Sequence, residues 1–325
     1  MNGKTLRAAL LVASASVFGV LITAPAALAD TTLTVGKASA NADPIIPVNI
    51  GYQVGIFQKH GLDLKIVDFT GGAKMVQALT AGAIDIGDGA GTEMAQVAKG
   101  APMIAICETA STFPFLGVGV PENSPAKSLA DLKGKAIGVS TAGSLTDWLA
   151  KRLAIHQGWD AATLKTVAIG NASAGIIAAF RTGQVDADMG ESALFFSMAE
   201  NKAGRLLAPV TDFQGSAVSG ALFASTKLVE SNPGAIRALL AGYVETLDWI
   251  RGHKAETVKI KSELRHYSEA VEAKDYDLTL GMYTKTCRFD AEGIATLKQS
   301  FADLKLTDGT PDMSKLYTEA YVPKR

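Results

Sequence analysis

The sequence lacks the excess of basic residues that a general nucleic-acid binder needs. Its 31 lysines and arginines are almost balanced by 32 acidic residues, and the formal net charge at pH 7 is −1. Hydrophobic residues make up 48% of the 325 residues, which excludes an intrinsically disordered chain. At roughly 100 to 200 residues per domain, the length predicts two or three domains. We therefore expect a globular protein with no nucleic-acid partner.

Cysteine and histidine are also scarce. The chain has two cysteines and four histidines, and none of them shows the spacing of metal ligands. We expect no metal site and no cofactor. Cys107 lies in an apolar run, which is typical of a buried small residue, whereas Cys287 lies near the start of a late helical segment. The spacing leaves open whether the two form a disulfide.

Long apolar runs are missing after the first 29 residues. Lys4 and Arg7 precede the apolar stretch Ala8–Ile22, and Ala27-Leu28-Ala29 has the small-x-small pattern of a cleavage site. The stretch is shorter than the roughly 20 residues that span a bilayer. These features predict a signal peptide over residues 1–29 and a mature, periplasmic protein. No cysteine lies directly after the cleavage site, so we expect no lipid anchor.

The rest of the chain alternates short strand-like runs with amphipathic helical segments that end at glycine. Leu33–Lys37 and Leu62–Phe69 have the pattern of strands, and Ile46–Lys59 that of a helix. Asn232 before Pro233 predicts the start of a long helix. This alternation favours an α/β fold with mainly parallel strands. Further expected helices are Ala73–Ala81, Thr92–Lys99, Ser144–Gln157 and Ser173–Thr182, and further expected strands are Ile84–Gly87, Ala136–Ser140, Lys165–Ile169 and Asp186–Met189.

An internal repeat predicts that the fold has two similar lobes. The segment Ala78–Asp85 is similar to Ala179–Asp186, and each copy has the pattern of a helix end, a glycine and a strand start. We expect residues 30–114 and 221–325 to form the first lobe and residues 115–220 the second. The apolar runs Phe115–Val120 and Ala221–Ala224 are expected to carry the chain between the lobes.

Several motifs occur in a familiar order over about residues 33 to 250. They are Gly55–Leu62, Ala78–Asp85, Ser128–Val139, Gly143-Ser144 and Gly183–Asp186. In this order they resemble the solute-binding proteins of ABC importers in the nitrate, taurine and alkanesulfonate group, whose fold is that of the thiamine-pyrimidine binders. The resemblance implies a type II periplasmic binding protein with discontinuous lobes joined by two crossovers. It also implies a monomer that traps a small molecule between its lobes and delivers it to a membrane ABC permease.

Ligands of open α/β sheets bind beyond the carboxyl ends of the strands, where helix N-termini point. In the loops that meet this description, Gly143 lets the backbone approach a ligand and Ser144 offers a hydroxyl group, although ordinary helix capping explains such a serine equally well. Glu191 matches a position where relatives carry an acidic residue followed by proline, but Ser192 stands in place of that proline. The candidate ligand-binding residues are Asn41, Asp43, Gly72, Ala73, Gly91, Thr92, Gly143, Ser144, Thr146 and Glu191.

The ligand itself is predicted from the charges of these loops. They contain Lys74 as their one cation, so a divalent anion would lack an arginine fork. We expect a small monoanion with an amine, such as taurine or another sulfonate, with Ser144 and Thr146 near the anionic end and Glu191 near the donor. The alternative is a neutral pyrimidine-type heterocycle that stacks on an aromatic ring. The aromatic candidates, each of which is as typical of a core, are Phe113, Phe115 and Trp148.

Two further classes of function compete with import. The fold also hosts enzymes, but the sequence has no nucleophile-elbow motif, no Cys-His cluster and no phosphate-binding glycine loop. An interaction protein of the cell envelope is the third class, and it would not be stabilised by a small ligand. We expect a binding protein without enzymatic activity.

Overall fold

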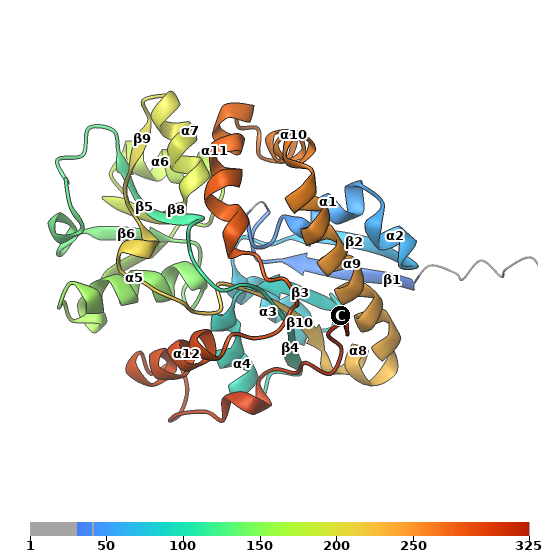
Figure 1. The fold of residues 1–325 in the computed structure, drawn as a ribbon. Coiled ribbons are helices and arrows are strands. Elements are labelled where there is room, and N and C mark those ends of the chain that lie inside the picture. The colour runs from blue at the N-terminus through green and yellow to red at the C-terminus, as the bar shows by residue number, and fades with distance from the viewer. Residues whose placement is uncertain (1–30, 41, 325) are drawn as a thin grey trace, which may run out of the picture.

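The computed structural model describes residues 31–40 and 42–324, and in it the chain forms two lobes, each built on a five-stranded sheet (Figure 1). The strand order of sheet A is β2-β1-β3-β10-β4, and that of sheet B is β7-β6-β8-β5-β9. Sheet A contains β1 (Thr31–Lys37), β2 (Leu62–Asp68), β3 (Ile86–Gly89), β4 (Met103–Ala110) and β10 (Gly220–Ser225). Sheet B contains β5 (Leu116–Pro121), β6 (Ala136–Val139), β7 (Lys165–Ala168), β8 (Ala187–Glu191) and β9 (Gly204–Pro209). The predicted signal peptide lies outside the described residues.

Both sheets are mixed, so the expectation of mainly parallel strands is wrong for part of each sheet. The strands β2, β1 and β3 are parallel to one another, as are β7, β6 and β8. In contrast, β10 is antiparallel to β3 and β4, and β5 is antiparallel to β8 and β9. Each of β5 and β10 enters its sheet from the other lobe. Because no helical crossover within the same sheet precedes them, nothing forces these strands to run parallel to their neighbours.

The two apolar runs that were expected to connect the lobes are strands instead. The run 115–120 largely forms β5, and the run 221–224 lies within β10. The chain crosses between the sheets in the segments just before them, over residues 111–115 and 210–219. Such runs pack as buried strands because their backbone groups need ladder partners.

The helices pack on the faces and edges of the two sheets (Figure 1). Gly55 has a φ of 77° and divides the single helix expected over residues 46–59 into two. The predicted start of α9 is confirmed, since Asn232 Oδ1 accepts a hydrogen bond from the Ala235 N–H at 3.1 Å. Within the described residues, no helix has the length and apolar character needed to cross a membrane. The helices are α1 (Pro47–Gln53), α2 (Ile56–Lys59), α3 (Gly72–Thr80), α4 (Met94–Ala98), α5 (Leu145–His156), α6 (Ser173–Thr182), α7 (Ser192–Glu200), α8 (Thr226–Ser231), α9 (Pro233–Gly252), α10 (Lys254–Arg265), α11 (Glu269–Thr279) and α12 (Ala291–Asp303).

The internal repeat occupies equivalent places in the two lobes. One copy ends α3 and leads into β3, and the other ends α6 and leads into β8. The matching glycines, Gly82 and Gly183, have φ angles of 72° and 69°, which other residues rarely adopt. The repeat therefore marks the same feature in both lobes, a glycine that ends the helix before β3 and before β8.

Two long-range links hold the C-terminal part of the chain in place. A disulfide joins Cys107 of β4 to Cys287, whose Cα atoms are 4.5 Å apart. The helix α11 packs against α7, and there Lys274 Nζ lies 3.7 Å from the centroid of the Phe196 ring. Helices that follow sheet A in sequence therefore reach the helices of sheet B.

Candidate functional site

A cavity of about 760 Å³, including the part open to solvent, lies between the two sheets. Its walls begin where the parallel strands of both sheets end, as expected for an open α/β sheet. The part of the wall next to sheet A includes Ala38, Ser39, Ala42, Pro44, Ile45, Gly72, Gly89, Ala90, Glu93 and Ser219, and Tyr267 lines the cavity from the segment after α10. The part next to sheet B includes Phe115, Leu116, Ser140, Ser144, Leu145, Thr146, Gly170, Asn171, Ser173, Ile176, Asp188, Met189, Gly190, Glu191 and Leu194.

Four of the candidate residues line this cavity. They are Gly72, Ser144, Thr146 and Glu191. Asn41 lies outside the described residues. The remaining candidates lie beside the cavity rather than in its wall, and they are Asp43, Ala73, Gly91, Thr92 and Gly143.

Asp43 belongs to a buried ion-pair cluster. Its carboxylate lies 2.7 Å from Lys261 Nζ and 2.9 Å from an Arg265 nitrogen. Burial alone would raise the pKa of Asp43, but the attraction of these two cations holds it at about 2. Glu272 and Asp275 complete the cluster. The geometry gives Asp43 a structural role behind the cavity.

Other candidates serve the backbone or their neighbours. The Gly143 N–H donates to Asp147 Oδ2 at 2.9 Å, and Gly143 has a φ of 74° that suits glycine. The Thr92 hydroxyl group donates to Glu93 Oε2 at 2.9 Å. Through that bond, Thr92 orients a carboxyl group that does line the cavity.

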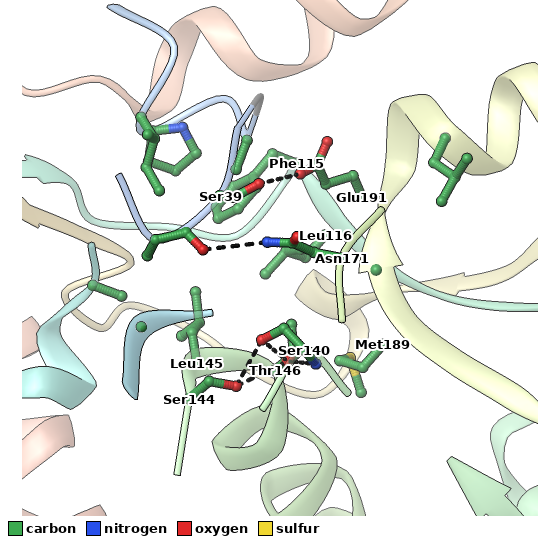
Figure 2. A pocket seen from close by; sticks show the side chains of 18 of the residues that line it. Ser39, Phe115, Leu116, Ser140, Ser144, Leu145, Thr146, Asn171, Met189 and Glu191 are labelled. Atoms are coloured by element: carbon green, nitrogen blue, oxygen red, sulfur yellow. Dashed lines mark hydrogen bonds between the residues drawn. The ribbon is translucent and has the colours of Figure 1, made fainter. Parts of the chain in front are cut away.

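The hydroxyl groups of Ser140, Ser144 and Thr146 form a compact cluster at the start of α5 (Figure 2). Their oxygens lie 2.9 to 3.1 Å from one another. Ser144 also caps α5 by accepting a hydrogen bond from the Asp147 N–H at 3.4 Å. Ser144 therefore both caps α5 and lines the cavity, two roles that the sequence left as alternatives.

Three carboxyl groups line the cavity: Glu93, Asp188 and Glu191. Burial raises the pKa of Glu93 to about 7, although hydrogen bonds to its carboxylate oppose that rise. Burial likewise raises the pKa of Glu191 to about 7, against the attraction of Arg265. For Asp188, burial and then repulsion by Glu191 place the pKa well above its usual value. The site is thus rich in carboxyl groups that are costly to ionise while the cavity is empty.

Sequence reasoning missed Asp188 as a site residue. It lies inside β8, between the apolar residues Ala187 and Met189, and only 1% of its surface is exposed. The expected site consisted of loops beyond the strand ends, which leaves out this strand position. A charged residue inside a buried strand was the available signal, because such residues are rarely buried without a role.

Hydrogen bonds cross the cavity from one lobe to the other. Ser39 Oγ donates to Glu191 Oε1 at 3.3 Å, and Asn171 Nδ2 donates to the Ala38 carbonyl oxygen at 3.2 Å (Figure 2). The hydroxyl groups of Ser173 and Tyr267 lie 2.9 Å apart. These contacts describe a closed arrangement of the two lobes.

The aromatic candidates divide between the cavity and the core. Phe115 lines the cavity. The rings of Phe113 and Trp148 are buried and pack on each other, with their centroids 5.9 Å apart. Lys74 is exposed and donates to Thr70 Oγ1 at 2.9 Å. Among the described residues, no group of three or more His, Cys, Asp and Glu side chains is placed to hold a metal ion.

Comparison with known families decides the assignment of the chain. Residues 44–257 match the sequence model of the family described as NMT1/THI5 like. The chain belongs to this NMT1/THI5-like family. The membership confirms the resemblance to solute-binding proteins that the sequence motifs indicated.

Relatives of this NMT1/THI5-like protein are known from sequence and from structure. It is 28% identical over 245 residues to a Brucella abortus protein named "Putative binding protein", in a match that covers 69% of this chain and 73% of the relative. Its fold is similar to that of the alkanesulfonate-binding protein SsuA from Xanthomonas axonopodis pv. citri bound to MOPS, with a TM-score of 0.76 and 19% identity over 88% of this chain and 98% of that one. The DszB enzyme, solved as a mutant in complex with biphenyl-2-sulfinic acid, shares the fold with a TM-score of 0.61 and 15% identity over 89% and 97% of the two chains. The fold is therefore that of the two-lobed periplasmic binding proteins.

Proposed function

We propose that this protein captures a small organic solute between its lobes in the periplasm and hands it to a membrane ABC permease. The observation that carries the proposal is the cavity between the sheets, whose wall is shared by both lobes and bridged by hydrogen bonds between them. A site divided in this way closes on its ligand by hinge motion. The hinge consists of the two crossing segments 111–115 and 210–219.

The division of the chain into lobes belongs to the same proposal. Residues 30–114 with 221–325 make one lobe and residues 115–220 the other, which is consistent with the membership of the two sheets. Export through the signal peptide at residues 1–29 would place the mature protein where a permease can receive it. An intact mass that begins at Asp30 in the periplasmic fraction is the expected result, and a mature protein that starts far from this residue would contradict the cleavage site.

The cavity wall supports binding rather than catalysis. Among its described residues there is no cysteine, histidine, lysine or arginine. The Ser140, Ser144 and Thr146 hydroxyl groups hydrogen-bond to one another and have no imidazole or amine beside them in that wall to activate a nucleophile. The similarity to DszB is one of fold, and fold does not imply function.

Two ligand classes were expected from the sequence, namely a sulfonate such as taurine and a pyrimidine-type heterocycle. The acidic wall favours the heterocycle over the sulfonate, because carboxyl groups accept hydrogen bonds from ring and amine nitrogens, and ionised carboxyl groups repel the anionic sulfonate. The ring of Phe115 and the side chains around it offer an apolar surface for the body of such a ligand.

Uptake in a strain that lacks this chain tests the proposed function. Any solute that stabilises the purified protein in a thermal-shift screen should no longer enter the deletion strain, and a plasmid copy should restore its uptake. X-ray scattering should show contraction when that solute is added. Unchanged uptake of every solute that the protein binds would remove the import function.

A further inference from the structure

Acidic side chains lie on both sides of the described cavity wall. Glu93 lies on the wall next to sheet A, and Asp188 and Glu191 lie on the wall next to sheet B. Among the described lining residues there is no basic side chain to balance these carboxyl groups. Once these carboxyl groups ionise, the two walls surround a ligand with negative charge when the lobes close.

Asp188 is the group whose bonding is incomplete. Its Oδ2 atom is buried and has no hydrogen-bond partner among the described residues. The side chain lies against the strand glycines, since a Cβ at Gly190 would come within 2.4 Å of the same oxygen. A buried carboxyl oxygen without a partner costs about 1 to 3 kcal/mol or more, so a donor brought by a ligand would be strongly favoured.

Three of the helices that begin at the cavity, α3, α5 and α7, already have carboxylates at their N-termini, which weakens them as anion sites, whereas α6 begins there at Ser173 without an acidic residue in its first turn. The Oε1 atom of Glu93 lies against Gly72 at the start of α3, where a Cβ would be 1.8 Å from it. At the start of α5, Asp147 accepts from the Gly143 N–H. Glu191 is itself the residue before the first turn of α7. The positive end of each of these helix dipoles therefore faces a carboxylate of the protein.

The cations closest to the cavity are engaged elsewhere. Arg265 attracts Glu191 but is buried in ion pairs with Asp43, Glu272 and Asp275. Lys37 is fully buried and lies 3.0 Å from Asp68 Oδ1. Neither lysine nor arginine is available in the described wall to hold a sulfonate or a nitrate.

We propose that the ligand is a small organic monocation with an apolar body, such as an amine or an amidine, whose N–H groups bind between Asp188 and Glu191. Glu93 completes the negative surroundings from the opposite wall, and the apolar body rests on Phe115 and Met189. This inference rests on the proposed solute-binding function and adds that the ligand carries a positive charge.

The affinity of such a ligand should depend on pH, because a cation binds best to ionised carboxyl groups. Glu93 and Glu191 have pKa values of about 7 in the ligand-free protein. A cation would therefore displace protons from them, and its affinity should rise from pH 6 to pH 8 by about tenfold for each carboxyl group that must ionise. An anion would show the opposite slope. The groups that act on Glu191 are Arg265, Asp43, Asp275, Asp188, Ser39 and Tyr267, and those that act on Glu93 are Thr92 and the Ala90 N–H.

Calorimetry with probes of equal shape and different charge tests the inference. Benzamidine, benzamide and benzenesulfonate share one ring, and butylamine and butanesulfonate provide an aliphatic pair. We expect the cations to bind at least tenfold more tightly than the matched anions at pH 8, and more tightly at pH 8 than at pH 6. Tighter binding of either sulfonate, a cation affinity that does not rise with pH, or no cation binding would overturn the cationic ligand. The uptake experiment with whatever solute binds then decides the import function separately.

Variants assign the effect to the carboxyl groups. Glu191→Gln should weaken binding of the better cation at least tenfold at pH 8 and reduce its pH slope by about one group. Glu93→Gln should also reduce the pH dependence of cation binding, while Asp188 and Glu191 on the opposite wall stay unchanged. Glu122→Gln makes the same chemical change at an exposed position outside the cavity and should leave both quantities unchanged. Full cation affinity in both cavity variants would contradict the inference even if the proteins fold normally.

Discussion

The hydroxyl groups of Ser173 and Tyr267 lie 2.9 Å apart, although Ser173 begins α6 beside sheet B and Tyr267 follows α10, which comes after the last strand of sheet A in sequence. Both residues line the cavity, and Tyr267 also packs against the hydrophobic cluster formed by α6 and α7. Burial raises the pKa of Tyr267 to about 12, which keeps its hydroxyl group protonated at neutral pH. We expect this contact to act as a latch that forms when the lobes close.

We predict that Tyr267→Phe weakens ligand binding about twofold to tenfold, because a hydrogen bond contributes about 0.5 to 1.5 kcal/mol to the closed form. Ser173→Ala should have a similar effect. The double variant should lose little more than either single variant, since both remove the same bond. Calorimetry with the tightest ligand measures all three.

The matched control for the latch is Tyr52→Phe. The Tyr52 hydroxyl group donates to Asp63 at 3.1 Å, within the lobe of sheet A and outside the cavity wall. Removal of this hydroxyl group should leave affinity unchanged. Additive losses in the Ser173 and Tyr267 variants would indicate independent ligand contacts and would contradict the latch.

We predict that the ligand-free protein is less stable at pH 8 than at pH 5.5. Burial raises the pKa of Glu93 and Glu191 to about 7 and that of Glu108 to about 8, above the value of 4.5 for an unperturbed glutamate. The folded protein therefore binds more protons than the unfolded chain between about pH 4.5 and 8, and stability falls as pH rises through this window. Asp43 has the opposite shift, but with a pKa of about 2 its contribution is complete below the window.

Glu93→Gln should flatten this pH profile. Glu93 is 4% exposed, so the ionisation of its side chain should cost on the order of 3 kcal/mol at pH 8. The variant should be more stable than the natural protein by a larger margin at pH 8 than at pH 5.5, because the cost starts to appear above the unperturbed pKa of 4.5. Urea denaturation at the two pH values measures the difference, with Glu122→Gln as the control. A profile that stays steep in Glu93→Gln would show that other groups dominate.

The fold was predictable because its signals are local. Helix stops at Gly82 and Gly183 and the cap at Asn232 depend on neighbouring residues, and the structure contains all three. The ion pair of Asp43 with Lys261 was not predictable, because these residues are 218 positions apart and nothing in either segment indicates the other. Asp43 therefore looked like a loop residue of the site. The same limit applied to strand direction, which depends on the lobe from which β5 and β10 arrive.

We predict that the disulfide contributes about 2 to 4 kcal/mol to the free energy of unfolding. Cys107 and Cys287 are 180 residues apart, so their bond removes much of the freedom of the unfolded chain. The double variant Cys107→Ala with Cys287→Ala should unfold at lower denaturant concentration but keep its ligand affinity, because neither cysteine lines the cavity. A reductant should lower the stability of the natural protein by a similar amount and leave the double variant unaffected. Equal stability with and without reductant in the natural protein would contradict this contribution.

Among the glycines of the described cavity wall, Gly72 leaves the least room for a side chain. A Cβ at Gly72 would lie 1.8 Å from Glu93 Oε1, so Gly72→Ala must displace that carboxyl group. Alanine favours a helix over glycine by roughly 0.5 to 1 kcal/mol, which offsets part of the cost of the displacement in the free energy of folding. We therefore expect a small change in melting temperature together with at least a tenfold loss of ligand affinity. Gly252→Ala is the matched control, because α9 ends there and a Cβ would meet no atom within 4 Å. Unchanged affinity in Gly72→Ala would mean that the position of the Glu93 carboxyl group does not matter for binding, and it would remove Glu93 from the site.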